Sequence, residues 1–371
     1  MTGKSGDKTR TRRDLLMQGA ACTAAIMTSS AMARPSLAAS GSSPGKGGQV
    51  ESVLGPLDAS RLGFTLAHEH VADAPGVLGR WPKSWGGEPG LVERAASALQ
   101  RARTAGVQTI VDLTTYDVGR DVRFLEKVSR KSGVQIIAAT GQRFFPPNSA
   151  NVVMPARTID GLAAYFRSEI EHGIDGTAIK AGVIKIGIIT NVPTELEEIG
   201  LRAAARASKA TGVPIRTHTN AARRAAEIHA VILESEGVEP ARVSFDHSDD
   251  SGDMDYFLGL VRRGYSLGMD HVHRGLDANF KPAFDRRADC IKRLVDAGFA
   301  DKLFLSQDSE FGGALLPEEV REWREKIDPP EGLLFVSRRL IPHLRTLGVA
   351  DRNIVAMMVD HPGLFFTRQG S

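Results

Sequence analysis

The sequence is poor in cysteine and has no long uninterrupted apolar run. Only Cys22 and Cys290 occur among its 371 residues, so no intramolecular disulfide can form if the first segment is removed. No stretch is apolar enough over about 20 residues to remain as a membrane-spanning helix. A chain with 42% hydrophobic and 25% charged residues can bury a full-sized core, so its stability must come from packing, with or without bound metal.

An excess of charge of one sign is also missing from most of the chain. The formal net charge is +3, and residues 1–33 contain five basic and two acidic side chains. The remainder is therefore neutral, and no basic face is left to meet a phosphate backbone. The composition argues against a nucleic-acid partner and favours a small-molecule substrate.

The first segment is typical of an export signal. Arg12 and Arg13 precede a mildly apolar run that ends in Ala31-Met32-Ala33, a small-x-small pattern at which signal peptides are cleaved. We predict a twin-arginine-type signal peptide over 1–33, a Ser/Gly/Pro-rich flexible linker over 34–49 and one folded domain over 50–371. The expected location is the periplasm, with membrane association as the alternative if Cys22 is a lipoprotein acceptor.

From Val50 onward, short apolar or β-branched runs alternate with helical patterns about every 30–40 residues, as in repeated βα units. Eight such runs predict an α/β fold in the form of a (β/α)8 TIM barrel. The predicted strands are Gly63–His68, Gln108–Leu113, Val134–Thr140, Ala181–Ile188, Val213–His218, Arg242–His247, Gly264–Asp270 and Lys302–Ser306.

The stretches between these runs are helical in pattern. They include Leu91–Ala105, Glu195–Thr211 and Ala222–Gly237, and glycines near the C-terminal ends of such stretches (Gly106, Gly212, Gly237 and Gly298) are expected to act as caps. An open doubly wound sheet is the competing architecture. It is disfavoured because no glycine-rich dinucleotide turn follows the first strand.

Ionisable residues gather where the predicted strands end. Six of the ten histidines lie there: His68, His70, His218, His247, His271 and His273. Residues two apart on a strand face the same side, so His68 and His70 can both aim at one ion. A single histidine is more often a hydrogen-bonded core residue, but a set at several strand ends predicts a metal site, because imidazole and carboxylate are ligands for zinc, manganese, iron and cobalt.

Lys185 is unusual because it lies in a strand otherwise fit for burial on both faces. A buried ammonium without a partner is costly. Three interpretations are open: a lysine that reaches solvent at the strand end, a Schiff-base lysine, or a lysine modified by carbon dioxide to a carbamate that bridges two metal ions. The histidines favour the carbamate, because two neighbouring cations need a bridging anion.

The blocks GFTLAHEH, GVIKIGI and HSDD, together with the twin-arginine signal, carry a family resemblance. From about Val50 to Phe366 the chain resembles the phosphotriesterases of the amidohydrolase superfamily. The resemblance implies a binuclear centre at the C-terminal face of the strands, with zinc as the expected metal and a hydroxide as a further bridge, and it implies a homodimer. The implied ligands are His68, His70 and Asp308 for the buried ion, His218 and His247 for the exposed ion, and carbamylated Lys185 bridging both.

The resemblance further implies that the bridging hydroxide attacks phosphorus and that Asp308 accepts its proton and relays it through His271 to Asp250. His271 directly follows the aspartate of the seventh strand, where lactonase-type relatives carry arginine, and this favours a phosphotriesterase. Arg143 stands where the family's phosphotriesterase has an aromatic wall for the leaving group. The expected substrate pocket includes Arg143, Phe144 and Phe311.

The leading hypothesis is therefore an exported phosphoric triester hydrolase. The alternative within the same family is a lactonase, acting on acyl-homoserine or other lactones, with triester hydrolysis as a side activity. Two hypotheses of other classes are a carbon–carbon lyase that uses Lys185 as a Schiff base and a barrel that only binds ligands.

Overall fold

The computed structural model describes residues 48–71, 87–144, 154–309 and 331–368. The predicted signal peptide, residues 34–47 of the predicted linker, and Phe311 lie outside these residues. Within the described residues, no helix combines the length and the apolar character needed to cross a membrane.

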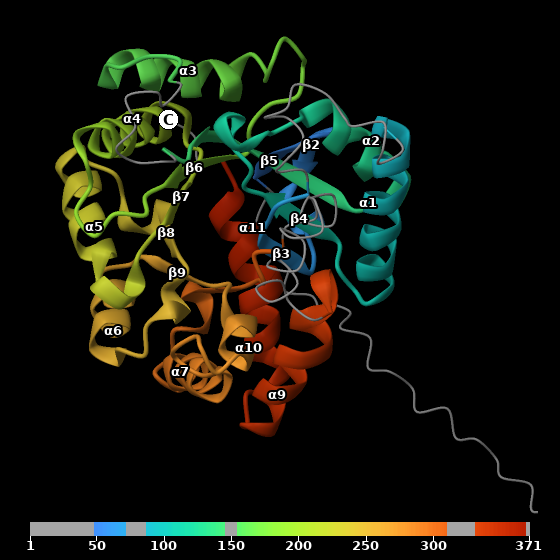
Figure 1. Ribbon diagram of the computed structural model, residues 1–371, viewed down its shortest axis with the longest axis vertical. Coiled ribbons are helices and arrows are strands. Elements are labelled where there is room, and N and C mark those ends of the chain that lie inside the picture. The colour runs from blue at the N-terminus through green and yellow to red at the C-terminus, as the bar shows by residue number, and fades with distance from the viewer. Residues whose placement is uncertain (1–47, 72–86, 145–153, 310–330, 369–371) are drawn as a thin grey trace, which may run out of the picture. The chain divides into compact units, whose positions relative to one another are not determined.

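Eight parallel strands form one sheet that curves into a nearly closed barrel inside a ring of helices (Figure 1). Each strand pairs with the next in sequence, and all eight predicted strands are confirmed with small shifts of their ends. The strands are β3 (Thr65–Glu69), β4 (Thr109–Asp112), β5 (Gln135–Gln142), β6 (Val183–Gly187), β7 (Ile215–His218), β8 (Val243–Asp246), β9 (Ser266–Met269) and β10 (Leu303–Leu305).

The last strand meets the first through polar contacts just beyond β10. The Asp308 amide donates to the His68 carbonyl at 3.1 Å, and the His70 amide donates to the Ser309 carbonyl at 2.9 Å. The buried carboxylate of Glu69 accepts from the Ser306 hydroxyl at 2.6 Å and from the Ser309 amide at 2.8 Å. These bonds hold β3 against the segment that carries Asp308. The barrel therefore closes, between its first and last strands, at the expected metal site.

The helices between the strands follow the predicted alternation, and three more helices follow β10 in the described residues. They are α1 (Gly87–Thr104), α2 (Val122–Ser132), α3 (Ile159–Glu171), α4 (Glu195–Thr211), α5 (Ala225–Ser235), α6 (Met254–Arg262), α7 (Phe284–Asp296), and after β10 α9 (Ile341–Thr346), α10 (Asp351–Val355) and α11 (His361–Phe366). Capping sets their ends: Thr194 and Glu197 form a capping box at α4, and Gly212 ends that helix at φ 71°.

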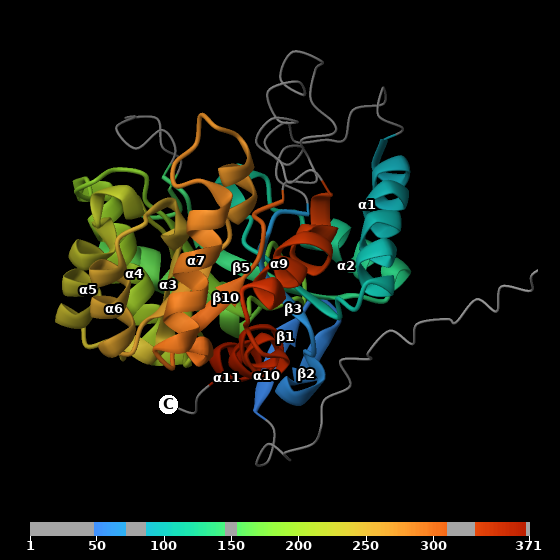
Figure 2. The same cartoon turned by 90° about the horizontal axis from the view of Figure 1, so that it is seen from below.

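A short antiparallel hairpin precedes the barrel and lies at the end of the strands opposite the candidate site. It consists of β1 (Gln49–Ser52) and β2 (Gly55–Asp58), and the Val53 amide donates to the Ile136 carbonyl near the start of β5. Figure 2 shows β1, β2 and α11 on the same side of the barrel. Buried Val50 and Leu57 of the hairpin pack with Phe365 and Phe366 of α11 and with apolar side chains of the strands, which closes this end and leaves the carboxyl ends of the strands for chemistry.

Candidate metal centre

The carboxyl ends of the strands surround a cavity of about 150 Å³. The described residues that line it are His68, His70, Leu113, Thr115, Val118, Arg143, Lys185, Gly187, His218, His247, Arg274 and Asp308. All six predicted metal ligands are therefore brought to one cavity. Three lie on β3, β6 and β7, His70 and His247 directly follow β3 and β8, and Asp308 is three residues beyond β10, at the face of a barrel where active sites are built.

One group of ligand atoms converges on the carboxylate of Asp308. Its Oδ1 lies 3.4 Å from His68 Nε2 and 3.3 Å from His70 Nε2. Among the described residues this buried oxygen has no hydrogen-bond donor. The backbone of Asp308 is left-handed, at φ 47°, a conformation that is costly for a non-glycine residue and is found at functional sites. Two imidazole nitrogens beside an unsatisfied carboxylate oxygen fit a divalent cation.

A second group forms around His218 and His247. His218 Nδ1 lies 2.8 Å from His247 Nε2, and His247 also has a left-handed backbone, at φ 59°. The Lys185 Nζ lies 3.2 Å from His68 Nε2, and all three side chains line the same cavity. The His218–His247 pair therefore lies beside the first group in one cavity, with Lys185 in reach of the first group.

The environment keeps the imidazoles of His68, His218 and His247 neutral, which is the form that binds metal. Burial, with the Lys185 charge second, lowers the pKa of His68 to about 3. Burial and the neighbouring His247 lower the pKa of His218 well below its ordinary range. The pKa of His247 is lowered by burial and by His271.

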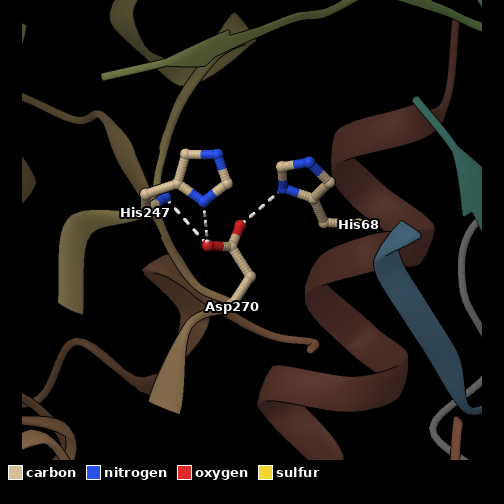
Figure 3. Close-up of side chains that lie close together, drawn as sticks. All are labelled: His68, His247 and Asp270. Carbon is tan, nitrogen blue, oxygen red and sulfur yellow. Dashed lines mark hydrogen bonds and ion pairs between the residues drawn. The ribbon is translucent and has the colours of Figure 1, made fainter. Parts of the chain in front are cut away.

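Asp270 fixes the orientation of one imidazole from each group, as Figure 3 shows. Its Oδ2 lies 2.7 Å from His68 Nδ1, and its Oδ1 lies 2.9 Å from His247 Nδ1 and also accepts from the His247 amide. Although burial opposes the charge, the two histidines hold the pKa of Asp270 well below its usual range. With both Nδ1 atoms taken, each ring turns Nε2 toward the cavity. The ligand atoms of His68, His247 and Asp270 are also close enough together to hold an ion. However, the Asp270 carboxylate already bonds both rings, so we assign it to positioning them.

Lys185 rests on a buried ionic network beneath the cavity. Its Nζ donates to Asp246 Oδ2 at 2.5 Å, and the fully buried Arg216 donates to Asp246 Oδ1 at 2.6 and 2.8 Å and to the Ala67 carbonyl. Burial lowers the pKa of Lys185, while the Asp246 charge opposes that shift. The side chain reaches the cavity from β6 instead of extending to open solvent.

The predicted relay residues are in contact. His271 Nε2 lies 2.9 Å from Asp308 Oδ2, and His271 Nδ1 lies 2.7 Å from Asp250 Oδ2. Burial disfavours the imidazolium, but the Asp250 charge and the hydrogen bonds to Asp250 and Asp308 together outweigh it and raise the pKa of His271 to about 9. The buried Arg287 donates to Asp249 and Asp250, which fixes the outer end of the chain of hydrogen bonds.

Of the two predicted pocket residues that the structure describes, one lines the cavity and one does not. Arg143 lines the cavity as predicted, but Phe144 does not. Phe144 is fully buried in the core with a left-handed backbone at φ 57°, and its ring lies so close to Gly200 of α4 that a Cβ there would come within 2.3 Å of it. The prediction that Phe144 lines the pocket is wrong, because the positive φ turns its ring toward α4.

The relationship to known proteins can now be stated. Residues 48–366 match the model of the phosphotriesterase family. The chain belongs to this family. A phosphotriesterase homology protein of Mycobacterium tuberculosis is 35% identical over 87% of this chain and 98% of its own length. An aryldialkylphosphatase of Saccharolobus solfataricus is 33% identical over 84% and 97% of the two chains. A solved structure of the Mycobacterium tuberculosis phosphotriesterase superimposes with a TM-score of 0.76, at 34% identity over 87% of this chain and 99% of that one.

Family membership confirms the expected resemblance and the barrel, and it makes a hydrolase the class of enzyme to which the site belongs. Sequence reasoning missed the residues beneath and beside the ligands, namely Arg216, Asp246, Asp270, Arg274 and Arg287. A signal existed for two of them, since Asp246 precedes His247 and Asp270 precedes His271 at predicted strand ends. The arginines carry no comparable pattern, because their contacts join residues far apart in sequence.

Proposed function

We propose that this phosphotriesterase-family chain hydrolyses organophosphate triesters at a centre of two divalent metal ions, zinc or alternatively manganese, cobalt or iron. The observation that carries the proposal is the convergence of four histidines with Asp308 and Lys185 on one cavity. His68, His70 and Asp308 would hold one ion, and His218 and His247 the other. When bound, such ions lower the pKa of a water and polarise the P=O oxygen of a substrate.

Lys185 is proposed to carry a carbamate formed with carbon dioxide, which would supply the anion between the two ions. Support comes from its burial, its 3.2 Å approach to His68 Nε2 and the two groups of ligands around it. Lys185→Ala should bind fewer than two ions per chain, and short-chain carboxylic acids that fit the gap should restore part of the binding. Two ions retained without such an acid would refute the carbamate.

A chain of hydrogen-bonded side chains would carry the proton away from the reacting centre. Asp308 Oδ2 accepts a proton from the attacking water, and His271, 2.9 Å away, takes it on after releasing, on the Asp250 side, the proton that its raised pKa keeps on the ring. Asp250 stabilises the charged imidazole at 2.7 Å, and Arg287 holds Asp250 in place at 2.7 Å. The chain of hydrogen bonds leads from the buried Asp308 to the half-exposed side chain of Asp250.

A lactonase is the second candidate, because the same centre can polarise a carbonyl oxygen and because one observation favours it. Among the described residues, no aromatic side chain other than histidine lines the cavity, and the family resemblance puts Arg143 where the phosphotriesterase has an aromatic wall for the leaving group. A polar lining weakens the apolar contact that an aryl triester needs.

The deciding experiment compares kcat/KM for an aryl dialkyl phosphotriester with kcat/KM for an acyl lactone, using protein loaded with divalent metal and bicarbonate. A ratio well above one supports triester hydrolysis, and a ratio well below one makes the chain a lactonase. Asp308→Asn should lower kcat for the preferred substrate by about 100-fold or more, since it loses both a ligand and a proton acceptor. The exposed Asp301→Asn is the matched control, and activity of Asp308→Asn within tenfold of wild type would sink the assignment.

A further inference from the structure

The described lining of the cavity is rich in positive charge. Arg143 and Arg274 line it together with a single carboxylate, Asp308. In the proposed function Lys185 and Asp308 serve the metal ions. The two guanidinium groups have no such task, and bound cations would make the surroundings more positive still. A neutral triester offers no anionic group for Arg274 to bind.

Arg143 is held over the ligands by its surroundings. The Asp117 carboxylate accepts from the amides of Arg143 and Phe144, at 3.0 to 3.2 Å. Gly187 at the end of β6 leaves room beneath it, since a Cβ there would approach the Arg143 Cγ to 2.6 Å. The Arg143 charge is close enough to contribute to the lowered pKa of His218, after burial and two nearer groups. The position of Arg143 at this cavity is therefore fixed by the fold.

Arg274 enters the cavity from the short helix Val272–Leu276 that follows β9, the opposite side of the barrel from Arg143. Its Nη2 lies 3.5 Å from Asp308 Oδ2, a long ion pair. Its Nε is buried and has no acceptor among the described residues. Its side chain is 25% exposed, so a molecule in the cavity can reach it.

Two buried arginines of the barrel, Arg216 and Arg287, are bonded more fully than Arg274, although Arg120 and Arg242 share its unpartnered Nε among the described residues. Arg216 donates to Asp246 and to a carbonyl at 2.6 to 2.8 Å. Arg287 donates to two aspartates and to the Pro282 carbonyl at 2.7 to 3.0 Å. In each of these two, the buried N–H groups have acceptors, whereas Arg274 makes one weak contact in the part of the chain that the structure describes. An arginine so placed is suited to an acceptor that arrives with the substrate.

We propose that the substrate of this site carries a carboxylate or similar monoanionic group outside the scissile bond, bound by Arg274 with support from Arg143. This inference rests on the proposed hydrolase function and names the class of its substrate. The reacting phosphorus or carbonyl centre would face Asp308, and the anion would lie against Arg274, with Arg143 adding positive charge from across the cavity. Arg274 and Arg143 are then the residues that select anionic over neutral substrates.

A pair of triesters that differ only in charge tests the proposal. The metal-loaded enzyme is given a dialkyl 4-carboxyphenyl phosphate and the matching 4-carbamoylphenyl phosphate, and the ratio of their kcat/KM values is measured. The ratio of carboxylate to carboxamide should fall about tenfold or more in Arg274→Gln, and further in the double variant with Arg143→Gln. Using the change in ratio cancels the different reactivities of the two leaving groups. If lactones are the better substrates, the same charge pair is placed on the acyl chain.

The matched control is Arg130→Gln, an exposed arginine on α2 that pairs with Glu126 and does not line the cavity. Its ratio should equal that of wild type. A ratio that is the same in Arg274→Gln, the double variant and wild type would overturn the proposal and leave the hydrolase function standing.

Binding of the products separates failure of the proposal from failure of the function. Calorimetry with 4-hydroxybenzoate and 4-hydroxybenzamide needs no turnover. Preferential binding of the anion that Arg274→Gln weakens about tenfold would support the anion site even if no triester or lactone is hydrolysed. Anion binding that neither arginine variant changes would place the anion on the metal ions and refute the proposal.

Discussion

At the scale of single residues, the centre depends on side chains that never face the substrate. Asp270 is the clearest case, because one carboxylate binds the Nδ1 atoms of His68 and His247 at 2.7 and 2.9 Å. These two imidazoles belong to different ligand groups. A single side chain therefore fixes the orientation of one ligand ring of each proposed ion.

Replacing Asp270 by asparagine should loosen this coupling. An amide keeps the shape but presents only one oxygen, so one of the two rings must face an NH2 group that cannot accept its proton. We expect Asp270→Asn to bind the metal ions about 10 to 100-fold more weakly, measured as ions per chain by elemental analysis after dialysis against a competing chelator. Asp289→Asn, which changes an exposed carboxylate paired with Arg286, is the control. Unchanged affinity for both ions in Asp270→Asn would contradict the assignment.

At the scale of elements, close packing of neighbouring strands sets the position of Lys185. Gly141 of β5 pairs with Lys185 of β6 and has φ 127°. A Cβ at Gly141 would come within 1.8 Å of the Lys185 carbonyl oxygen. The approach of these two backbones, which only glycine permits, brings the lysine to the cavity.

Gly141→Ala should therefore destabilise the barrel by about 3 kcal/mol or more, because backbone cannot yield as a flexible side chain does. The measurement is the free energy of unfolding by denaturant, together with the number of metal ions retained per chain, which should fall. Gly259→Ala on the exposed side of α6, where no atom lies within 4 Å of the added Cβ, should instead stabilise by about 0.5 to 1 kcal/mol. Equal free energies of unfolding for the two variants would show that the close approach of β5 and β6 does not require glycine at position 141.

At the scale of the whole molecule, buried histidines outside the site make folding sensitive to acid. His229 of α5 is fully buried, and neither ring nitrogen has a partner among the described residues. Burial alone lowers its pKa from 6.5 to about 3. The unfolded chain binds this proton more readily, so the contribution of His229 is complete above pH 6.5 and is lost as the pH falls toward 3.

His229→Leu should remove this sensitivity. One proton costs about 1.4 kcal/mol per pH unit, so His229 alone should lower the free energy of unfolding by about 2 kcal/mol between pH 7.5 and pH 5. The free energy of unfolding is measured for the variant and for wild type at the two pH values. The change in their difference isolates this amount, because the pH dependence of metal binding is common to both proteins and cancels. The exposed His172→Gln should leave the slope unchanged. A His229→Leu slope equal to that of wild type would mean that His229 titrates normally in the folded protein.

Much of the fold and of the ligand set follows from the sequence by itself. Strand and helix periods are local properties, and a polar residue directly after an apolar run must lie at the carboxyl end of a strand. This is why all eight strands were predicted, and why His68, His70, His218, His247 and Asp308 were expected at one face, where the cavity lies; the place of Lys185 among the ligands came from the family resemblance.

Tertiary structure decided how these side chains are supported and which others join them. Asp270 reaches His68 across about 200 positions of the chain, and Glu69 joins β3 to the residues after β10, contacts that no local pattern encodes. Phe144 lies in the core because its backbone takes a positive φ beside Gly200, and Arg274 faces Asp308 only once β9 and β10 are neighbours. Local periodicity determines where a strand ends, whereas the direction of a side chain beyond that end depends on dihedral angles and on neighbours that only the closed barrel supplies.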